Sequence, residues 1–316
     1  MEPAPNHAFL IRILTPLWLI SQIVGCSQQA APASSQATSA AASAQAAAQA
    51  ATPAQSGATA SKIDKPLQAQ LMALIFGTKY RSASGDALAT LPDINERQKM
   101  EEYVLTPESW HALPDGGIAM VANAQLPSAD GPSHGQPGLL NVYLLRKNGE
   151  QWQVQKRFEN LAELGSNGVF GEVEWLNLAP GKPGFLVHHG WTGQGQTISG
   201  FSVFALGQDQ VQALTPQGIN DHTDNDGDCL EDTDQCWNLD GKWRLDQARN
   251  NAPYQDIIID YQGEQSTRAA PGSGNSAAST SVARNTVKVS GHARYGFDGK
   301  QYRLIEGKAM SEGPLN

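Results

Sequence analysis

Short connections between strand-like segments constrain the fold of this 316-residue chain more than any other feature. Seven such segments span residues 117–125, 139–146, 151–157, 171–177, 184–189, 201–205 and 254–261. The connections 147–150 and 178–183 are only four and six residues long. A parallel crossover needs a dozen residues or more, so short connections favour antiparallel pairing. We therefore predict a mainly β fold built on an antiparallel sheet, arranged as a meander, a sandwich or a propeller-like array.

Three dipeptides predict tight hairpins. Asn148-Gly149, Asp240-Gly241 and Asp298-Gly299 each stand between strand-like segments. A type I′ turn needs positive φ at two positions, and Asn-Gly or Asp-Gly adopts such angles at low cost. Each dipeptide is therefore expected to join two neighbouring strands.

A small helical part is expected before the strands. Asp64 can cap a helix whose first turn contains Pro66, and apolar residues recur at helical spacing from Leu67 to Ile75. A second helical stretch is predicted over residues 93–102. The strand-like segments begin only after this region.

The start of the chain has the pattern of an export signal. Arg12 is the only Lys or Arg before Cys26, and the apolar stretch from Ile13 to Val24 is too short to span a bilayer. This stretch, closed by Gly25 and Cys26, resembles the lipobox of bacterial lipoproteins. The resemblance implies a signal peptide over residues 1–25, a diacylglyceryl group on the Cys26 thiol and an acylated new N-terminus, typically carrying palmitate. A plain signal peptide and an uncleaved anchor are the alternatives.

The residue after Cys26 bears on the destination of the protein. Ser27 stands where the enterobacterial sorting rule prefers Asp for retention in the inner membrane. The resemblance therefore implies an outer-membrane lipoprotein that faces the periplasm. Its two or three acyl chains would attach Cys26 stably to the lipid bilayer.

Residues 26–61 are predicted to form a flexible tether behind the lipidated cysteine. From Ser27 to Ser61 no side chain is charged or aromatic, and nearly all residues are Ala, Ser, Gln, Thr or Pro. Such a segment buries too little apolar surface to offset its ordering entropy. The remaining residues, 62–316, are expected to form a single β-rich periplasmic domain. Within it, the Gly/Ser/Ala-rich stretch 263–282 is predicted to be a flexible inserted loop.

The acidic charge is concentrated in residues 221–236, which we call the acidic loop. This loop contains six Asp and one Glu with no Lys or Arg, while the whole chain has a formal net charge of −9. Nucleic-acid binding needs clustered Lys and Arg to neutralise phosphates. The composition therefore argues against a nucleic-acid partner.

The acidic loop carries the strongest chemical signal in the sequence. Carboxylates at relative positions 1, 3, 5 and 9 can surround a Ca²⁺ ion, which takes six to eight oxygen ligands. The pattern resembles the D-x-D-G-D-x-x-x-D calcium loop of FG-GAP-type repeats. The resemblance implies side-chain ligands and one carbonyl ligand, namely Asp224, Asp226, Asp228 and Asp232 with Leu230. A solvated acidic loop and a surface for a cationic protein partner are the alternatives.

Cys229 and Cys236 are the cysteines that remain once Cys26 is assigned to lipid. An even pair in an exported protein is best interpreted as a disulfide, here closing a small loop. A metal-binding pair and two free thiols are the alternatives. The spacing is not C-x-x-C, which weakens both a metal-binding and a redox interpretation.

Histidine and tryptophan residues supply weaker candidate sites. His188 and His189 are adjacent on a strand, so their side chains should point to opposite faces and not share a metal. Trp191 lies in a Gly-rich segment and could stack on a ligand, although a tight inter-strand loop is the simpler interpretation. His134 is expected to be a surface residue. No G-x-S-x-G, S-x-x-K or H-E-x-x-H motif occurs.

These features favour a non-enzymatic, membrane-anchored lipoprotein with a binding or structural role and a calcium-stabilised acidic loop. An envelope protein or a glycan is the expected partner. An envelope hydrolase with dispersed His and Asp/Glu residues is the main alternative, and it predicts that His134, His188 or His189 converges with a carboxylate. An inhibitor or immunity lipoprotein is a third possibility.

Overall fold

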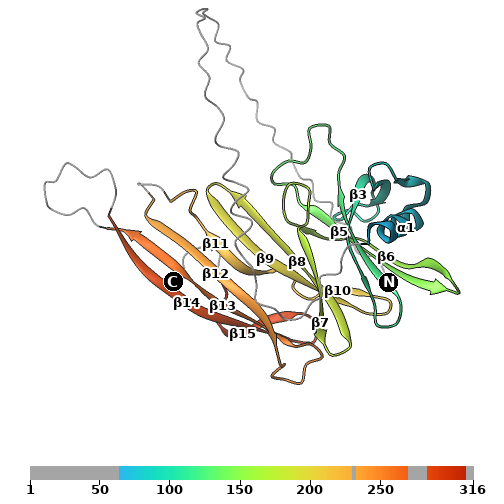
Figure 1. Cartoon of the computed structure of the whole chain (residues 1–316). Helices are drawn as coiled ribbons and strands as arrows, with labels where there is room; N and C mark the ends of the chain where they lie inside the picture. The colour runs from blue at the N-terminus through green and yellow to red at the C-terminus, as the bar shows by residue number, and fades with distance from the viewer. Residues whose placement is uncertain (1–63, 230–232, 270–282, 311–316) are drawn as a thin grey trace, which may run out of the picture. The chain divides into compact units, whose positions relative to one another are not determined.

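Two antiparallel sheets organise the described part of the chain, which in this computed structural model comprises residues 64–229, 233–269 and 283–310 (Figure 1). One α-helix, α1 (Lys65–Phe76), and one short 3-10 helix, η2 (Gly77–Lys79), precede the strands in this described part. The predicted mainly β, antiparallel fold with a small helical part is therefore confirmed.

The strands of the two sheets follow each other along the chain. The six-stranded sheet has the order of the sequence and consists of β1 (Tyr80–Arg81), β2 (Asp86–Pro92), β3 (Met100–Ala112), β4 (Ile118–Gln125), β5 (Gly138–Asn148) and β6 (Gln151–Leu164). The nine-stranded sheet has the order β15, β14, β13, β12, β11, β9, β8, β7, with β10 paired to β9. Its members are β7 (Glu172–Ala179), β8 (Lys182–Gly193), β9 (Gln196–Leu206), β10 (Val211–Ala213), β11 (Ile219–Asp224), β12 (Gln235–Asp246), β13 (Asp256–Arg268), β14 (Arg284–Phe297) and β15 (Tyr302–Gly307).

Helix α1 forms where the sequence predicts it. The Asp64 carboxylate accepts a hydrogen bond from the Leu67 backbone N–H at 3.2 Å, and Pro66 lies in the first turn, where no intrahelical donor is needed. The apolar face of the helix packs on the six-stranded sheet, and the Phe76 ring meets Tyr143 edge-on at 5.4 Å. This contact covers one face of the sheet.

The central strands of the six-stranded sheet are buried on both faces. In β4 and β5, Met120 and Tyr143 belong to the cluster under α1, whereas Val121 and Leu144 belong to a second cluster shared with Phe185 of β8. Alternate residues thus serve two cores, which explains why both strands are almost continuously apolar. The second cluster joins the two sheets face to face.

The nine-stranded sheet curls back on itself at one end. The Gln255 N–H donates to the Leu178 carbonyl at 2.7 Å, although β8, β9, β11 and β12 lie between β7 and β13 in the sheet. At the same end, the Tyr302 N–H donates to the Leu214 carbonyl at 2.8 Å. A third apolar cluster, which includes Phe201 and Ile259, fills the inside of this curl.

A buried arginine lies at this closed end of the sheet. The Arg294 guanidinium donates to Asp256 Oδ2 at 2.7 Å, to Asp246 Oδ2 at 2.9 Å and to the Gln247 carbonyl at 2.8 Å. The side chains of Arg294 and Asp256 are only 9% and 3% exposed. Because both charged groups are buried away from water, removing either one would leave the other without a compensating charge.

Two of the three predicted hairpin turns are confirmed. Asn148-Gly149 joins β5 to β6, and Asp298-Gly299 joins β14 to β15. In the first turn, Asn148 pairs with Gln151 and Gly149 has a φ of 64° at the first central position. A single glycine with positive φ at that position fits a type II′ turn better than the predicted type I′ turn.

The third predicted turn is wrong. Asp240-Gly241 lies inside β12, where Asp240 pairs with His222 of β11 on one side and with Gln262 of β13 on the other. A strand held by two neighbours remains extended through a dipeptide that would favour a turn in isolation.

The predicted helix over residues 93–102 is also wrong. The Asp93 carboxylate accepts hydrogen bonds from the backbone N–H groups of Asn95 at 2.8 Å and Glu96 at 2.7 Å, which closes a local turn. The chain then enters β3 at Met100 and pairs with β2. Side-chain capping by Asp therefore starts a turn here without a helix behind it.

The predicted flexible loop over residues 263–282 is wrong in its first part. Residues Gly263–Arg268 continue β13 and pair with both β12 and β14. The rest of that loop, residues 270–282, lies outside the described residues.

The predicted signal peptide, the lipidation site at Cys26 and the tether lie outside the described residues. These assignments therefore stay predictions. Among the described residues, no helix is long and apolar enough to cross a membrane.

Candidate functional site

Three loops that are distant in the sequence meet around Trp191. They comprise residues 126–137 between β4 and β5, residues 165–171 between β6 and β7, and residues 190–195 at the β8–β9 hairpin, and we call them together the Trp191 platform. His134 of the first loop donates through Nε2 to the Thr192 carbonyl, and its Nδ1 lies 3.3 Å from Asn167 Oδ1. One imidazole thus connects all three loops.

Trp191 is held in place yet remains accessible. Trp191 is 38% exposed, and the centroid of its indole lies 6.5 Å from the centroid of the His134 ring. Gly193 lies directly against the indole, because a Cβ at this position would come within 2.2 Å of Trp191 Cζ2. The glycine therefore makes room for the ring at the end of the hairpin.

The tip of the same hairpin touches the acidic loop. Gly195 has a φ of 75°, and a Cβ there would lie 2.5 Å from the Asp228 backbone nitrogen. A glycine is required for both reasons, since other residues rarely adopt this φ and no space remains for a side chain. The Trp191 platform and the acidic loop therefore form one continuous region, which we call the loop end.

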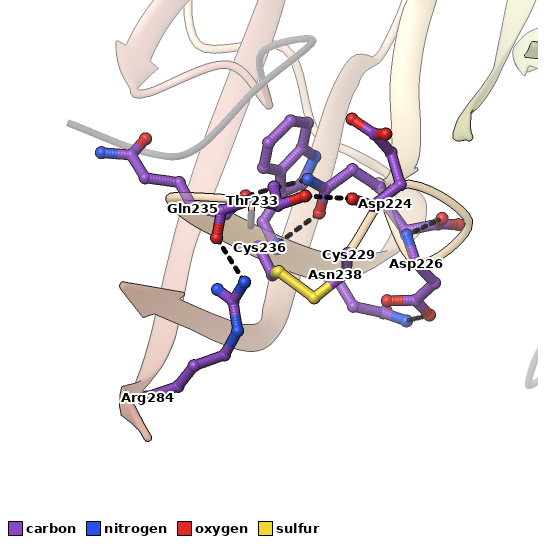
Figure 2. The surroundings of a disulfide bond; sticks show 11 residues. Asp224, Asp226, Cys229, Thr233, Gln235, Cys236, Asn238 and Arg284 are labelled. Carbon is purple, nitrogen blue, oxygen red and sulfur yellow. Dashed lines mark hydrogen bonds between the residues drawn. A yellow bond between two sulfur atoms is a disulfide. The ribbon is translucent and has the colours of Figure 1, made fainter. Parts of the chain in front are cut away.

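The acidic loop is closed by the predicted disulfide. Cys229 and Cys236 are bonded, with their Cα atoms 5.5 Å apart (Figure 2). In this view Arg284 lies to one side of the disulfide and donates to the Thr233 carbonyl, whereas Asp224 and Asp226 lie to the other side. The disulfide prediction is confirmed.

A buried asparagine fixes the shape of this loop. Asn225 Oδ1 accepts from the Trp237 backbone N–H at 2.8 Å, and Asn225 Nδ2 donates to the Gln235 carbonyl at 2.9 Å. Asn225 is only 2% exposed. The sequence pattern gave no structural role to this residue, because it occupies a non-ligand position of the calcium motif.

Two of the predicted calcium ligands, Asp224 and Asp226, have protein partners. Asp224 Oδ1 accepts from the Asp226 N–H at 3.0 Å, and Asp226 Oδ2 accepts from Asn238 Nδ2 at 2.7 Å. Within the described ranges, no group of three or more His, Cys, Asp or Glu side chains is placed to hold a metal ion. The calcium assignment therefore stays a prediction. Leu230 and Asp232, two of the five predicted ligands, lie outside the described residues.

His222 is a site residue that sequence reasoning missed. Its Nε2 lies 2.8 Å from Asp224 Oδ2 and its Nδ1 lies 2.7 Å from Asp240 Oδ1. Although burial opposes the charged form, hydrogen bonds to Asp224 and Asp240 raise the pKa of His222. The fold thus places an imidazole whose protonated form is favoured between two carboxylates, within the acidic loop. Because the partners come from β11 and β12, only the strand register could have revealed this arrangement.

A shallow hollow of about 320 Å³ lies next to the loop end. It is lined by Gly171, Glu172, His188, His189, Gly190, Ser199, Gly200 and Asp221. His188 Nε2 lies 3.0 Å from Glu174 Oε2, and Ser199 Oγ lies 3.5 Å from Asp221 Oδ1. Burial raises the pKa of Asp221, so its charged form is disfavoured in the fold.

The two adjacent histidines have different partners. His188 pairs with Glu174, whereas His189 Nε2 lies 3.0 Å from Ser202 Oγ. Burial, with a smaller contribution from the nearby His188, lowers the pKa of His189. These separate environments agree with the expectation that the two side chains point to opposite faces of the strand.

The segment that contains the hairpin of Trp191 and the acidic loop is strongly acidic. Residues 183–241 include nine Asp or Glu and no Lys or Arg, which equals the formal net charge of −9 of the whole chain. They contain β9, β11 and most of β8, together with the acidic loop. Anionic ligands are disfavoured on such a surface.

No protein-family model, no curated protein and no solved structure matches the chain. The function must therefore be inferred from the residues of the loop end and of the neighbouring hollow.

Proposed function

We propose that this protein is a lipid-anchored, non-enzymatic binding protein of the bacterial envelope. Cys26 holds it in the outer membrane, the segment 26–61 spaces it from the bilayer, and the β domain faces the periplasm. The loop end is the binding surface, and its partner is an envelope protein or a glycan. The observation that carries this proposal is the convergence of three loops on the accessible Trp191.

The binding role is tested by site-specific photo-crosslinking in cells that express the full chain. A photoreactive amino acid at position 191 is expected to capture an envelope component repeatedly. The same group at Leu304, an exposed residue of β15, is the matched control. Equal or absent capture at the two positions would contradict a binding surface at the loop end.

The anchoring role is tested by metabolic labelling with palmitate. The wild-type chain is expected to incorporate label and to fractionate with the outer membrane. Cys26→Ser is expected to lose both properties, because the acyl chains supply the membrane affinity. Labelled Cys26→Ser protein would contradict lipidation at this residue.

Calcium binding by the acidic loop is a separate proposal that the motif supports. It requires Asp224 and Asp226 to exchange their present protein donors for the cation. Calcium is expected to increase the free energy of unfolding of the EDTA-treated chain by about 2.7 kcal/mol at a hundredfold excess over Kd, and so to raise its unfolding midpoint. Asp226→Ala should abolish this rise, and no rise at millimolar calcium would reject the site.

The hollow gives a specific reason to keep hydrolysis as a second candidate function. His188 is oriented by Glu174 and lines the same surface as Ser199 and Asp221, which are residue types used in acid–base and nucleophilic catalysis. Chromogenic ester, phosphoester and glycoside substrates provide the test. Activity that His188→Ala abolishes and His292→Ala preserves would favour this function. His292 is the matched control, because it also contacts a glutamate but is exposed and does not line the hollow.

A further inference from the structure

We infer that the Trp191 platform binds a neutral polysaccharide, with the Trp191 indole stacked on one sugar ring. This inference rests on the proposed binding function and names the chemical class of the ligand. It is carried by three properties of the platform, namely a fixed aromatic ring, a polar rim and an almost complete lack of charge.

The aromatic ring is presented in a defined position. The Trp191 indole is bounded by Gly193 and by the His134 ring, while the residue remains 38% exposed. The His134 contact with the Thr192 carbonyl holds the neighbouring backbone in place. A rigid aromatic side chain loses little conformational entropy on binding, so it is suited to act as an anchor.

The rim of the platform consists of amide and hydroxyl groups. Asn167 Nδ2 donates to Ser166 Oγ at 3.3 Å, and Thr192 Oγ1 donates to Thr197 Oγ1 at 3.2 Å. Such groups offer donors and acceptors at once, as do the hydroxyl groups of a sugar. Asn167 and Gln194 have positive φ values of 55° and 52°, and each precedes a glycine with positive φ, as the two central positions of a type I′ turn require.

The charge of the platform limits the ligand class. Residues 126–137, 165–171 and 190–195 include no Lys, Arg or Glu, and Asp130 is their single Asp. Phosphate and carboxylate ligands are recognised by Arg, Lys or clustered N–H donors, and ammonium ligands by carboxylates. A platform with neither set of charges is suited to an uncharged ligand.

A sugar fits this combination better than a protein does. A stable protein interface buries about 800 Å² on each partner around several apolar anchors. The platform instead offers one indole surrounded by polar groups. A pyranose ring has one apolar face of C–H groups and a periphery of hydroxyl groups, so a single ring matches the indole and its rim together.

The test is calorimetric titration of the purified full chain in detergent with neutral oligosaccharides of glucose, mannose and N-acetylglucosamine. At least one of them is expected to bind, and Trp191→Ala is expected to weaken that binding tenfold or more. Trp191→Phe should give an intermediate affinity, because a smaller ring still stacks. Leu304→Ala, which removes another exposed apolar side chain, should bind like the wild type. Thermal unfolding of each variant checks that the fold is retained.

Two results would overturn the inference. One is the absence of binding to every neutral oligosaccharide while crosslinking at position 191 still captures a partner, which would leave the proposed function standing. The other is binding of spermidine or polyphosphate that Trp191→Ala weakens tenfold, because the platform would then recognise a charged ligand. If neither sugar binding nor position-specific crosslinking is observed, the proposed function is rejected as well.

Discussion

The six-stranded sheet and the loop end differ in how they use their residues. In β4 and β5 nearly every side chain is buried, and successive residues fill two different apolar cores. At the loop end, glycines allow close backbone contacts, and polar side chains are held by hydrogen bonds while Trp191 stays accessible. The first region supplies stability, and the second presents chemical groups to solvent. Mutations should therefore separate the two regions by their effect on unfolding.

The largest loss of stability is expected from a substitution of Arg294, a buried polar residue outside the loop end. Stability therefore does not come from apolar residues alone. Arg294→Ala leaves Asp256 buried without its charged partner and should cost about 3–5 kcal/mol in the free energy of unfolding. Urea denaturation measures this loss. Arg303→Ala is the matched control, because the exposed ion pair of Arg303 with Asp298 should contribute less than about 1 kcal/mol. Similar losses in both variants would contradict a structural role for the buried pair.

The apolar core between the sheets should be nearly as sensitive. Leu144 is fully buried at 0% exposure, and Leu144→Ala should cost about 2–5 kcal/mol through lost contacts and a cavity. Leu304→Ala, at 44% exposure, should change stability by about 0.5 kcal/mol or less. Equal urea midpoints for the two variants would show that the face-to-face packing of the sheets is not maintained in solution.

The disulfide should contribute a smaller amount to stability within the loop end. Replacing both Cys229 and Cys236 by Ser removes a cross-link between residues separated by 7 positions, which corresponds to about 2 kcal/mol of loop-closure entropy. Reduction of the wild-type chain should lower its thermal midpoint, whereas the double variant should not respond to the reductant. A wild-type midpoint that is the same in both redox states would argue against this contribution.

The smallest effect is a gain in stability, expected from a substitution of Asp221. It would show that the region around the hollow keeps a charged group at a cost in stability. Burial raises the pKa of Asp221 above its value in the unfolded chain, so the stability linked to this group is present at low pH and is lost as pH rises through the folded-state pKa. Asp221→Asn should therefore stabilise the protein by about 0.5–1 kcal/mol at pH 7 and by little below about pH 4. Asp209→Asn, which removes one negative charge at an exposed position, is the matched control for the change in net charge.

Local signals in the sequence predicted the elements that depend on local interactions. The capped helix at Asp64 and the turns at Asn148-Gly149 and Asp298-Gly299 form as expected, because each is decided by a few neighbouring residues. Asp240-Gly241 failed as a turn because β11 and β13 hold it in an extended strand. Pairing with distant strands outweighs the preference of a dipeptide.

The candidate site was predicted as separate pieces. The sequence indicated Trp191, the acidic loop and the disulfide, but it did not indicate that they adjoin. His134 reaches Thr192 across 58 positions of the chain, and His222 joins carboxylates from two strands. Such contacts depend on loop packing and strand register, for which a single sequence carries no local pattern.

The contact between Gly195 and the acidic loop has a mechanical consequence. A Cβ at Gly195 would meet the Asp228 Cβ, the Asp228 backbone nitrogen and the Gly227 carbonyl carbon, so the two segments are in direct contact there. The acidic loop therefore cannot move toward the hairpin at this point unless the hairpin tip moves with it. A residue larger than glycine at position 195 or 227 would therefore force the two loops apart.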